Sequence, residues 1–370
     1  MSEYRFDQIA INSTEKKKPE ESDKYTYIGL EHLDSMDLEV HRWGSEVAPK
    51  GEKLLMKKGD VLFGKRRAYQ KKVAIAPFDG IFSAHGLVLR PNEKIVDKDF
   101  FPLFISSDYF LDAAIKISVG SLSPTINWRD LRELKFCLPD LETQRKLAKV
   151  LWAINATMQN YKVLLAKTDE LVKSQFIELF GDPIENDKGW ETKPLKSVAP
   201  ECRPSIPKQE RYWWLNLDMI ESYSGYVVAK VYESIENIGN STSTFDDTMV
   251  LYSKLRPYLN KVIVPDDFGY ATTELVGLKP DERVLNKYFL FNLFRGDQFV
   301  SYANGLSAGG QMPRMPMKEM RNFQCILPPL ELQERFVEFY KQSDKSKFGK
   351  EMCDKWILEI QNIYRQGYLI

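Results

Sequence analysis

The feature that most constrains this chain is a short motif that occurs twice, 189 residues apart. Leu138–Gln144 reads LPDLETQ, and Leu327–Gln333 reads LPPLELQ. In each copy a proline precedes an apolar and acidic turn, which is typical of the first turn of a helix. The sequence therefore predicts two equivalent helices, each preceded by an equivalent segment of chain.

The repeat extends far upstream of the motif. The same offset aligns about 80 residues without a gap. The matched positions carry apolar, basic and aromatic side chains, among them Leu62 and Leu251, Lys65 and Lys254, Arg67 and Arg256, Tyr69 and Tyr258, and Lys72 and Lys261. Such agreement indicates an ancestral duplication. We expect domains at residues 1–138 and 182–327, followed by spacer helices at residues 139–181 and 328–370.

Each domain has the pattern of an α+β fold with a mixed β-sheet. Short apolar runs bounded by Gly, Pro or Asp predict strands at Val61–Phe63, Val73–Ile75 and Gly86–Leu89. Aromatic residues at three-to-four spacing predict helical stretches at Lys98–Ile117 and Asn286–Tyr302. The cluster at residues 212–214, a tyrosine and two tryptophans, is interpreted as core rather than as a stacking platform.

The first spacer helix has a narrow apolar seam. Its residues alternate at spacings of three and four, namely Leu147, Leu151, Ile154, Met158, Tyr161, Leu165 and Val172. A seam of this width requires a partner helix. The second helix supplies Phe336, Ile357 and Ile360, with a polar middle between them, so we expect an antiparallel coiled coil. The alternative is two unrelated surface helices.

Composition excludes several classes of protein. The 52 basic and 52 acidic residues cancel, so overall charge does not indicate a polyanion ligand. Four cysteines without a CxxC pair, and three histidines, argue against a disulfide framework and an ordinary zinc site, and they fit a reducing cytoplasm. The sequence begins without an apolar signal core and contains no run long enough to span a membrane.

A basic segment is repeated in both domains and has the side chains that DNA recognition requires. Major-groove readout uses Arg or Lys on guanine and Asn or Gln on adenine, with further cations on phosphates. The candidate DNA-binding residues are Lys65, Arg66, Arg67, Tyr69, Lys71 and Lys72 in the first domain, and Lys254, Arg256, Tyr258 and Lys261 in the second. The alternative is a solvated charged face, but recurrence at matched positions favours DNA contact.

A second candidate loop precedes each motif, at Val119–Asn127 and Asn304–Arg314. Glycine and proline permit close backbone approach there, and short polar side chains could contact bases or phosphates. The candidates are Ser121, Ser123 and Asn127 in the first loop, and Ser307, Gln311 and Arg314 in the second. An ordinary surface loop is the alternative. Differences between the loops are expected if each domain reads different bases.

Catalytic motifs are absent from the sequence. There is no GxxxxGK[ST] phosphate loop, and no Asn/Asp-Pro-Pro-aromatic tetrapeptide to hold an extruded adenine. His85 corresponds to Glu274 in the repeat and has no nucleophile beside it, so a catalytic role is not expected. We predict a protein without catalytic or metal-binding residues.

With these features, the chain resembles the specificity subunits of type I restriction–modification enzymes. The resemblance rests on the doubled LPxLExQ motif, on FIELFGDP at residues 176–183, and on GWExxPL at residues 189–195. It implies two target-recognition domains that each read half of a split site in double-stranded DNA, held apart by a coiled coil of spacer helices. The first domain departs from the pattern, since it lacks the Trp-x-x-x-x-Leu opening of the second.

The resemblance also implies partners. The spacer helices would dock adenine-N6 methyltransferase subunits, expected to number two, and motor-nuclease restriction subunits could join them. S-adenosylmethionine, ATP and Mg would then bind only in partner subunits, with no cofactor in this chain and no membrane contact.

Two other classes of function remain open from the residues alone. An enzyme with an undetected site would cleave or methylate DNA without a partner. A protein-binding scaffold would tolerate charge reversal at Lys65, Arg67, Lys254 and Arg256 without loss of DNA modification.

Overall fold

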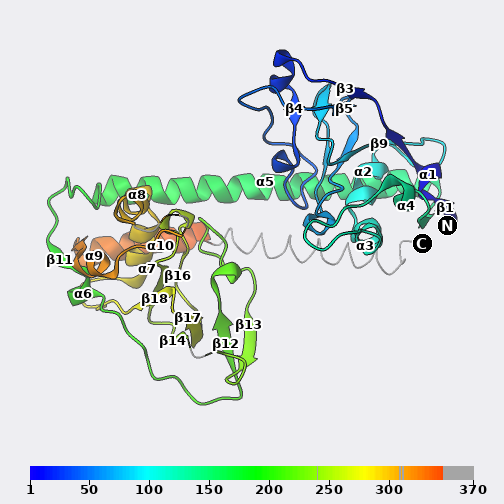
Figure 1. The fold of residues 1–370 in the computed structure, drawn as a ribbon. Coiled ribbons are helices and arrows are strands. Elements are labelled where there is room, and N and C mark those ends of the chain that lie inside the picture. Colours follow the sequence, from blue (N-terminus) through cyan, green and yellow to red (C-terminus); the bar gives the residue numbers. More distant parts are fainter. Residues whose placement is uncertain (240, 308–309, 311, 345–370) are drawn as a thin grey trace. The chain divides into compact units, whose positions relative to one another are not determined.

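The computed structural model describes residues 1–239, 241–307, 310 and 312–344. Tertiary contacts divide the chain into two compact units, and the division falls between Tyr161 and Lys162. This boundary lies inside a continuous 40-residue helix, α5 (Leu141–Phe180). Each unit therefore contains one of the predicted domains together with part of this helix (Figure 1).

The first unit has three sheets, and one of them is mixed, as the sequence predicted. One is an antiparallel ribbon of β1 (Ser2–Arg5) and β10 (Lys135–Leu138). The second is antiparallel, with the strand order β2 (Ala10–Ser13), β9 (Leu87–Pro91), β6 (Val61–Phe63) and β7 (Val73–Ile75). The third is mixed, with the order β3 (Lys16–Lys17), β5 (Lys53–Met56), β8 (Gly80–Phe82) and β4 (Tyr27–Ile28).

The antiparallel four-stranded sheet is buried on both faces. Val61 and Phe63 of β6 pack into the helical core, whereas Leu62 between them packs against residues of the mixed sheet. Side chains alternate along a strand, so a run of three apolar residues can serve two layers. This burial on both sides explains why the predicted strand Val61–Phe63 has no polar face.

The helices of the first unit supply its aromatic core. They are α1 (Phe6–Ile9), α2 (Phe100–Ser106), α3 (Asp108–Lys116) and α4 (Trp128–Leu131), with short 3-10 helices η1 (Glu21–Tyr25), η2 (Leu30–His32) and η3 (Ala68–Gln70). The predicted helix Lys98–Ile117 is interrupted at Ser107, which is extended and whose Oγ accepts a hydrogen bond from the Phe110 amide at 3.3 Å. This N-cap starts α3 in a new direction.

The second unit repeats the arrangement. Its ribbon pairs β11 (Thr192–Pro194) with β19 (Gln324–Ile326). A three-stranded sheet has the order β16 (Val262–Ile263), β15 (Val250–Ser253) and β18 (Leu275–Leu278). The mixed sheet has the order β13 (Val231–Ser234), β12 (Arg211–Leu215), β17 (Gly269–Thr272) and β14 (Thr242–Phe245).

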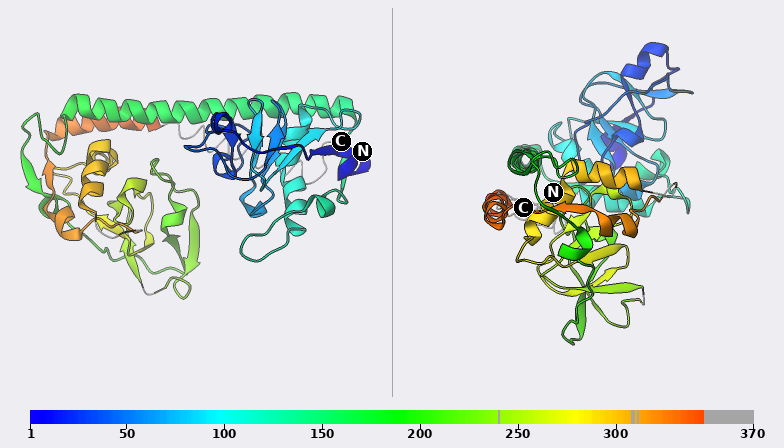
Figure 2. Two further views of the ribbon diagram at one scale, coloured as in Figure 1. Left: turned by 45° about the horizontal axis from the view of Figure 1, so that its top comes forward. Right: turned by 90° about the vertical axis from the view of Figure 1, so that its left-hand side faces the viewer.

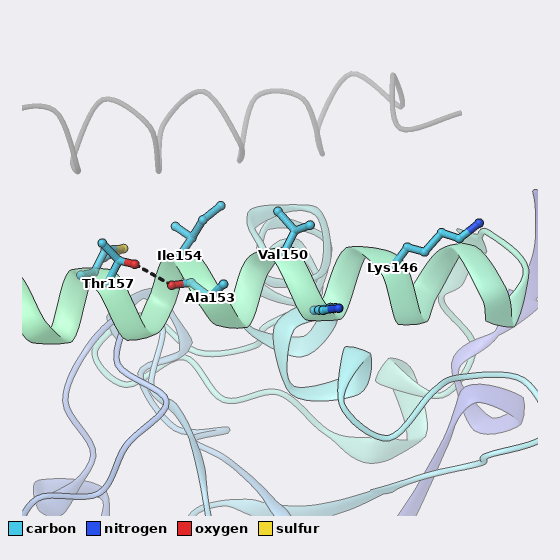
Figure 3. Close-up of a pocket in the computed structure, with 7 residues that line it drawn as sticks. Lys146, Val150, Ala153, Ile154 and Thr157 are labelled. Atoms are coloured by element: carbon cyan, nitrogen blue, oxygen red, sulfur yellow. Dashed lines mark hydrogen bonds between the residues drawn. The ribbon is translucent and has the colours of Figure 1, made fainter.

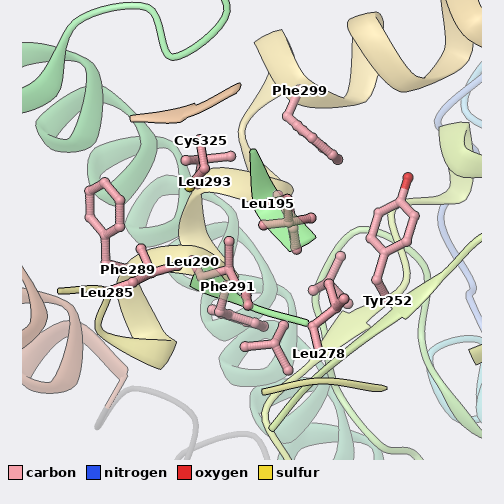
Figure 4. Close-up of a cluster of buried hydrophobic side chains, with 14 of the residues drawn as sticks. Leu195, Tyr252, Leu278, Leu285, Phe289, Leu290, Phe291, Leu293, Phe299 and Cys325 are labelled. Atoms are coloured by element: carbon pink, nitrogen blue, oxygen red, sulfur yellow. The ribbon is translucent and has the colours of Figure 1, made fainter. Parts of the chain in front are cut away.

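The second unit's helices cover the three-stranded sheet. They are α6 (Leu195–Val198), α7 (Lys287–Arg295), α8 (Asp297–Leu306), α9 (Met317–Asn322) and α10 (Leu330–Asp344), with 3-10 helices η4 (Leu217–Met219) and η5 (Pro257–Leu259). Figure 4 shows side chains of α7, including Phe289, Leu290 and Leu293, meeting Leu195 and Cys325 in the core. The predicted helix Asn286–Tyr302 is broken at Gly296. Trp213 of β12 is buried, as predicted.

The two parts of α5 join different cores. Ala148 is buried against the first core, where Leu147 and Trp152 are partly buried, and Val172, Phe176 and Phe180 are buried in the second. Leu147 and Val172, which the sequence assigned to a helix–helix seam, pack into the first and the second core, and the cluster around Val172 includes Phe336 of α10. The remaining seam residues are half-buried, namely Leu151, Ile154, Met158, Tyr161 and Leu165.

The start of α10 contacts the end of α5 within the second unit. The Phe336 ring lies 5.4 Å from that of Phe176 and 5.6 Å from that of Phe180. Figure 2 shows α10 beside this part of α5, running in the opposite direction. Ile357 and Ile360, also predicted for the seam, lie outside the described residues.

In the first unit, Ile154 and Met158 line a groove along α5, part of which Figure 3 shows.

A buried glutamine explains the repeated motif. Gln144 is fully buried; its Oε1 accepts from the Asp97 amide at 2.8 Å, and its Nε2 donates to the carbonyls of Ile95 (3.0 Å) and Pro139 (2.8 Å). Gln333 makes the same three bonds at matched positions, with the Asn286 amide, the Val284 carbonyl and the Pro328 carbonyl. Each glutamine therefore fixes the start of its helix to the loop before α2 or α7.

Candidate nucleic-acid interface

Three segments that are distant in the sequence converge in the first unit. They are the segment after β6, the turn between β8 and β9, and the loop at residues 119–127. The Arg67 amide donates to the Pro124 carbonyl at 2.7 Å, and the Arg66 amide donates to the His85 carbonyl at 3.3 Å. The two loops that the sequence singled out therefore form one continuous surface.

The second unit has the same convergence, with one backbone bond shifted by one residue. The Arg256 amide donates to the Pro313 carbonyl at 2.7 Å, and the Lys254 amide, one residue before the counterpart of Arg66, donates to the Glu274 carbonyl at 3.0 Å. In addition, the Met315 amide donates to the Lys254 carbonyl at 2.9 Å, as the Ile126 amide does to the Lys65 carbonyl. The duplication thus preserved the backbone of this surface.

A backbone conformation that is uncommon for residues with side chains recurs in both surfaces. Arg67 and Lys71 have φ values of 54° and 50°, and their counterparts Arg256 and Asn260 have values of 50° and 47°. These residues flank the single turns η3 and η5. Left-handed conformations at non-glycine residues carry a cost and are enriched at functional sites. Their exact recurrence in position indicates that both domains require this shape.

Several predicted residues project from the first surface. Arg66, Arg67, Ser121 and Asn127 are exposed, and the Tyr69 side chain is 56% exposed. Ser123 is half-buried, and its Oγ accepts from the Arg67 Nε at 3.5 Å. Exposed guanidinium groups can form bidentate hydrogen bonds to guanine or to phosphate, so this surface has the chemistry for duplex DNA.

The second surface is less uniformly basic. Arg314 is exposed, but its Nη2 lies 3.0 Å from the Glu274 Oε1. Arg256 and Ser307 are half-buried, and the Ser307 Oγ donates to the Ala303 carbonyl at 2.7 Å. Tyr258 is 39% exposed. Gln311, also predicted for this site, lies outside the described residues.

Three of the predicted lysines have internal partners. The Lys72 Nζ donates to the Leu30 carbonyl at 2.7 Å, and the Lys261 Nζ donates to the Leu217 carbonyl at 2.6 Å. Burial lowers the pKa of Lys261. Lys71 bonds to Asp108 (2.5 Å) and Asp112 (3.3 Å). Burial opposes its charge, but the two carboxylates outweigh burial and raise the pKa of Lys71.

Sequence reasoning missed Leu122, Lys16 and Arg203. Leu122 lies at the tip of the first loop and is 92% exposed. Its only signal in the sequence was an apolar residue between two serines. Burial, followed by the charge of Lys16, lowers the pKa of Lys65, while Arg203 lines the same recess as Lys254. Their proximity depends on strand pairing, which no local pattern reveals.

Within the described residues, the structure shows no group of three or more His, Cys, Asp or Glu side chains placed to hold a metal ion. A search of the same residues for a helix long and apolar enough to cross a membrane found none.

Comparison with known proteins gives one family for both halves of the chain. Residues 7–167 and 187–351 match the model of the type I restriction modification DNA specificity domain. The type I restriction enzyme MjaIX specificity subunit of Methanocaldococcus jannaschii is 23% identical over 350 residues, covering 85% of this chain and 75% of that protein. The putative MjaX specificity subunit of the same organism is 20% identical over 395 residues, covering 97% and 91%.

The fold agrees with a solved structure. The crystal structure of the type I restriction–modification S subunit from M. genitalium aligns over 100% of this chain and 94% of its own length, with a TM-score of 0.53 and 14% identity. These relatives are specificity subunits, which are non-catalytic. Since the family model covers most of both halves, the chain belongs to the type I restriction–modification DNA specificity family.

Proposed function

We propose that this chain is the DNA-reading subunit of a type I restriction–modification enzyme, with each domain reading one half of a two-part target. The observation that supports this most is the duplicated surface, whose backbone bonds are kept while its side chains differ. Arg67 and Arg256 form the same amide bonds to a proline carbonyl, whereas His85 in the first surface stands where Glu274 stands in the second. A shared shape with different side chains suits two readers of different sequences.

The kept and the changed positions suggest different roles. Phosphates are common to every half-site, so the residues that recur in both surfaces, such as Arg67 and Tyr69, would contact the DNA backbone. The changed positions would read bases. At these positions Arg66 corresponds to Leu255, His85 to Glu274, and Ser123 to Met312. Lys71, Lys72 and Lys261 are left out of this contact set, because their ammonium groups already have partners within the protein.

Methyltransferase subunits would dock on α5. Val163, Leu164 and Leu171 of this helix are 60%, 51% and 54% exposed, and they form an apolar patch on adjoining faces of the helix. In this proposal the partner subunits bind S-adenosylmethionine, with ATP and Mg bound by restriction subunits where these are present. The near-zero net charge suits weak DNA binding by this chain alone, with the partners adding phosphate contacts in the cytoplasm.

The test of two-part reading uses the chain together with its co-purified methyltransferase subunit. Methylation is measured on DNA pools in which one half-site or the other is randomised. Arg66→Ala with His85→Ala should relax selection at one half only, and Arg314→Ala with Glu274→Ala should relax selection at the other only. Each lost base contact is worth about 1–3 kcal/mol of discrimination.

Matched controls are available at the opposite ends of the same strands. Lys94 follows β9, whereas His85 precedes it, and Lys279 follows β18, whereas Glu274 precedes it. Lys94→Ala and Lys279→Ala should leave both half-sites unchanged. If a double variant altered both half-sites equally, or neither, independent reading by the two domains would be wrong.

The docking surface and the spacing role are tested separately. Leu164→Asp with Leu171→Asp should abolish co-purification of the methyltransferase, whereas Glu142→Ala, an exposed change at the distant start of α5, should not. Insertion of four residues near Thr168, about one helical turn, should lengthen the gap between half-sites without changing their sequences. A change in the half-site sequences would contradict the spacing role.

A further inference from the structure

The second unit contains a polar recess of about 460 Å³ beside the candidate interface. Lys254, Arg203 and Arg321 line it, together with Ser243 and Thr273. Thr273 precedes Glu274 in the turn between β17 and β18, and the Lys254 carbonyl accepts from the Met315 amide, next to Arg314. The recess is therefore continuous with the surface described above.

The charges in this recess are not balanced. The Arg321 Nε is 2.6 Å from the Glu201 Oε1, so this cation is paired. For the side chains of Lys254 and Arg203, no hydrogen bond or ion pair is found among the described residues. Two cations that share a recess repel each other, and a bound anion converts this repulsion into attraction.

The first unit has a lysine at the corresponding position. Lys65 matches Lys254 in the repeat and is half-buried. Burial, followed by the Lys16 charge, lowers the pKa of Lys65. The Lys16 Nζ lies 3.5 Å from the Glu52 Oε2, and both of these side chains are more than half exposed.

Resting on the proposed function, we infer that Lys254 with Arg203 binds a DNA backbone phosphate, that Lys65 does so at the matching position of the first domain, and that these contacts set the register of each domain on the duplex. Lysine offers a compact charge with no acceptor, which suits phosphate better than the mixed donor and acceptor edges of bases. The hydroxyl groups of Ser243 and Thr273 add neutral donors, and the recess has room for the sugar attached to the phosphate.

The test measures the affinity of the methyltransferase complex for duplex DNA over a range of salt concentrations. Lys254→Gln should reduce the slope of log K against log salt by about 0.9, and should weaken binding roughly eight-fold at 0.1 M salt. The loss should be equal for the target and for DNA with a scrambled half-site. The double variant Lys65→Gln with Lys254→Gln should show twice this change in slope. Lys254→Arg keeps the positive charge and should retain the slope of the wild type.

The controls separate this inference from the proposed function. Lys279→Gln, an exposed change beyond the far end of β18, should leave the slope unchanged, and equal melting temperatures exclude misfolding. A duplex carrying one neutral methylphosphonate at the contacted position should bind wild type and Lys254→Gln equally. An unchanged slope, or a shift in base preference, would overturn the phosphate site while leaving two-part reading intact. Absence of sequence-specific binding by the wild-type complex would instead refute the proposed function.

Discussion

Replacing Gln333 by alanine should destabilise the second unit strongly. Its side chain is fully buried and makes three hydrogen bonds, at 2.9 Å to the Asn286 amide, 3.0 Å to the Val284 carbonyl and 2.8 Å to the Pro328 carbonyl. A buried hydrogen bond contributes about 1 kcal/mol, and partner groups left unsatisfied add a desolvation penalty. The expected loss is about 3–4 kcal/mol of unfolding free energy, partly offset by a few tenths from the helix propensity of alanine.

This magnitude is large enough to measure by calorimetry. For a unit of this size it corresponds to a fall of roughly 10 °C in the transition of the second unit. Hydrogen exchange gives a local measure, because the Asn286 amide loses its acceptor and should exchange faster. Gln144→Ala should do the same to the Asp97 amide in the first unit.

The matched control lies on the same helix. Gln342 is exposed, and its side chain has no hydrogen bond among the described residues, so Gln342→Ala should change the unfolding free energy by less than about 0.5 kcal/mol. If Gln333→Ala cost no more than this control, the glutamine would not be what fixes the helix start, and the repeated motif would need another explanation.

Three further predictions concern single groups. The Arg295 side chain is 6% exposed and its Nη2 lies 2.6 Å from the Asp169 Oδ1, so Arg295→Met should lower the unfolding free energy by about 3 kcal/mol. The control Asp297→Asn removes an exposed ion pair with Lys173 and should change the unfolding free energy little. Equal shifts in melting temperature for the two variants would contradict this prediction. Burial raises the pKa of Cys325 to about 12, so its thiol stays protonated at pH 8. Cys137 is exposed, and mass spectrometry should therefore find it alkylated by iodoacetamide long before the buried Cys325. Hydrogen bonding from Arg283 lowers the pKa of Asp281 to about 2. The ionised Asp281 carboxylate therefore stabilises the fold above about pH 4, and this contribution is lost as the pH falls through about 2. A carboxyl titration by NMR should show this midpoint, and Arg283→Ala should return it toward 3.8.

The sequence predicted the local elements well where one pattern decides them. Val61–Phe63 and Val73–Ile75 are strands with the predicted bounds, because short β-branched runs between turn residues leave few other conformations. The long helix at α5 followed from its apolar spacing and from the motif at its start. The breaks at Ser107 and Gly296 were missed, since aromatic spacing continues across them and only backbone capping reveals the interruption.

The candidate site could be predicted only in part, because charge in a sequence does not show its partner. Lys71 and Lys72 looked equivalent to Arg66 and Arg67 in a basic run. In the structure the two lysines bond to Asp108 and to the Leu30 carbonyl, whereas the two arginines project from the surface. These contacts are set by tertiary packing.

The duplication offers a way to sort the repeated residues by cause. Gln144 and Lys72 recur as Gln333 and Lys261, and both pairs are accounted for by identical internal hydrogen bonds. Their recurrence therefore reflects the scaffold. Tyr69 and its counterpart Tyr258 also recur, yet they are 56% and 39% exposed, and packing gives no reason to keep them. Under the proposed function, these two tyrosines would contact a feature that every half-site shares, and in a duplex that feature is the backbone rather than the bases.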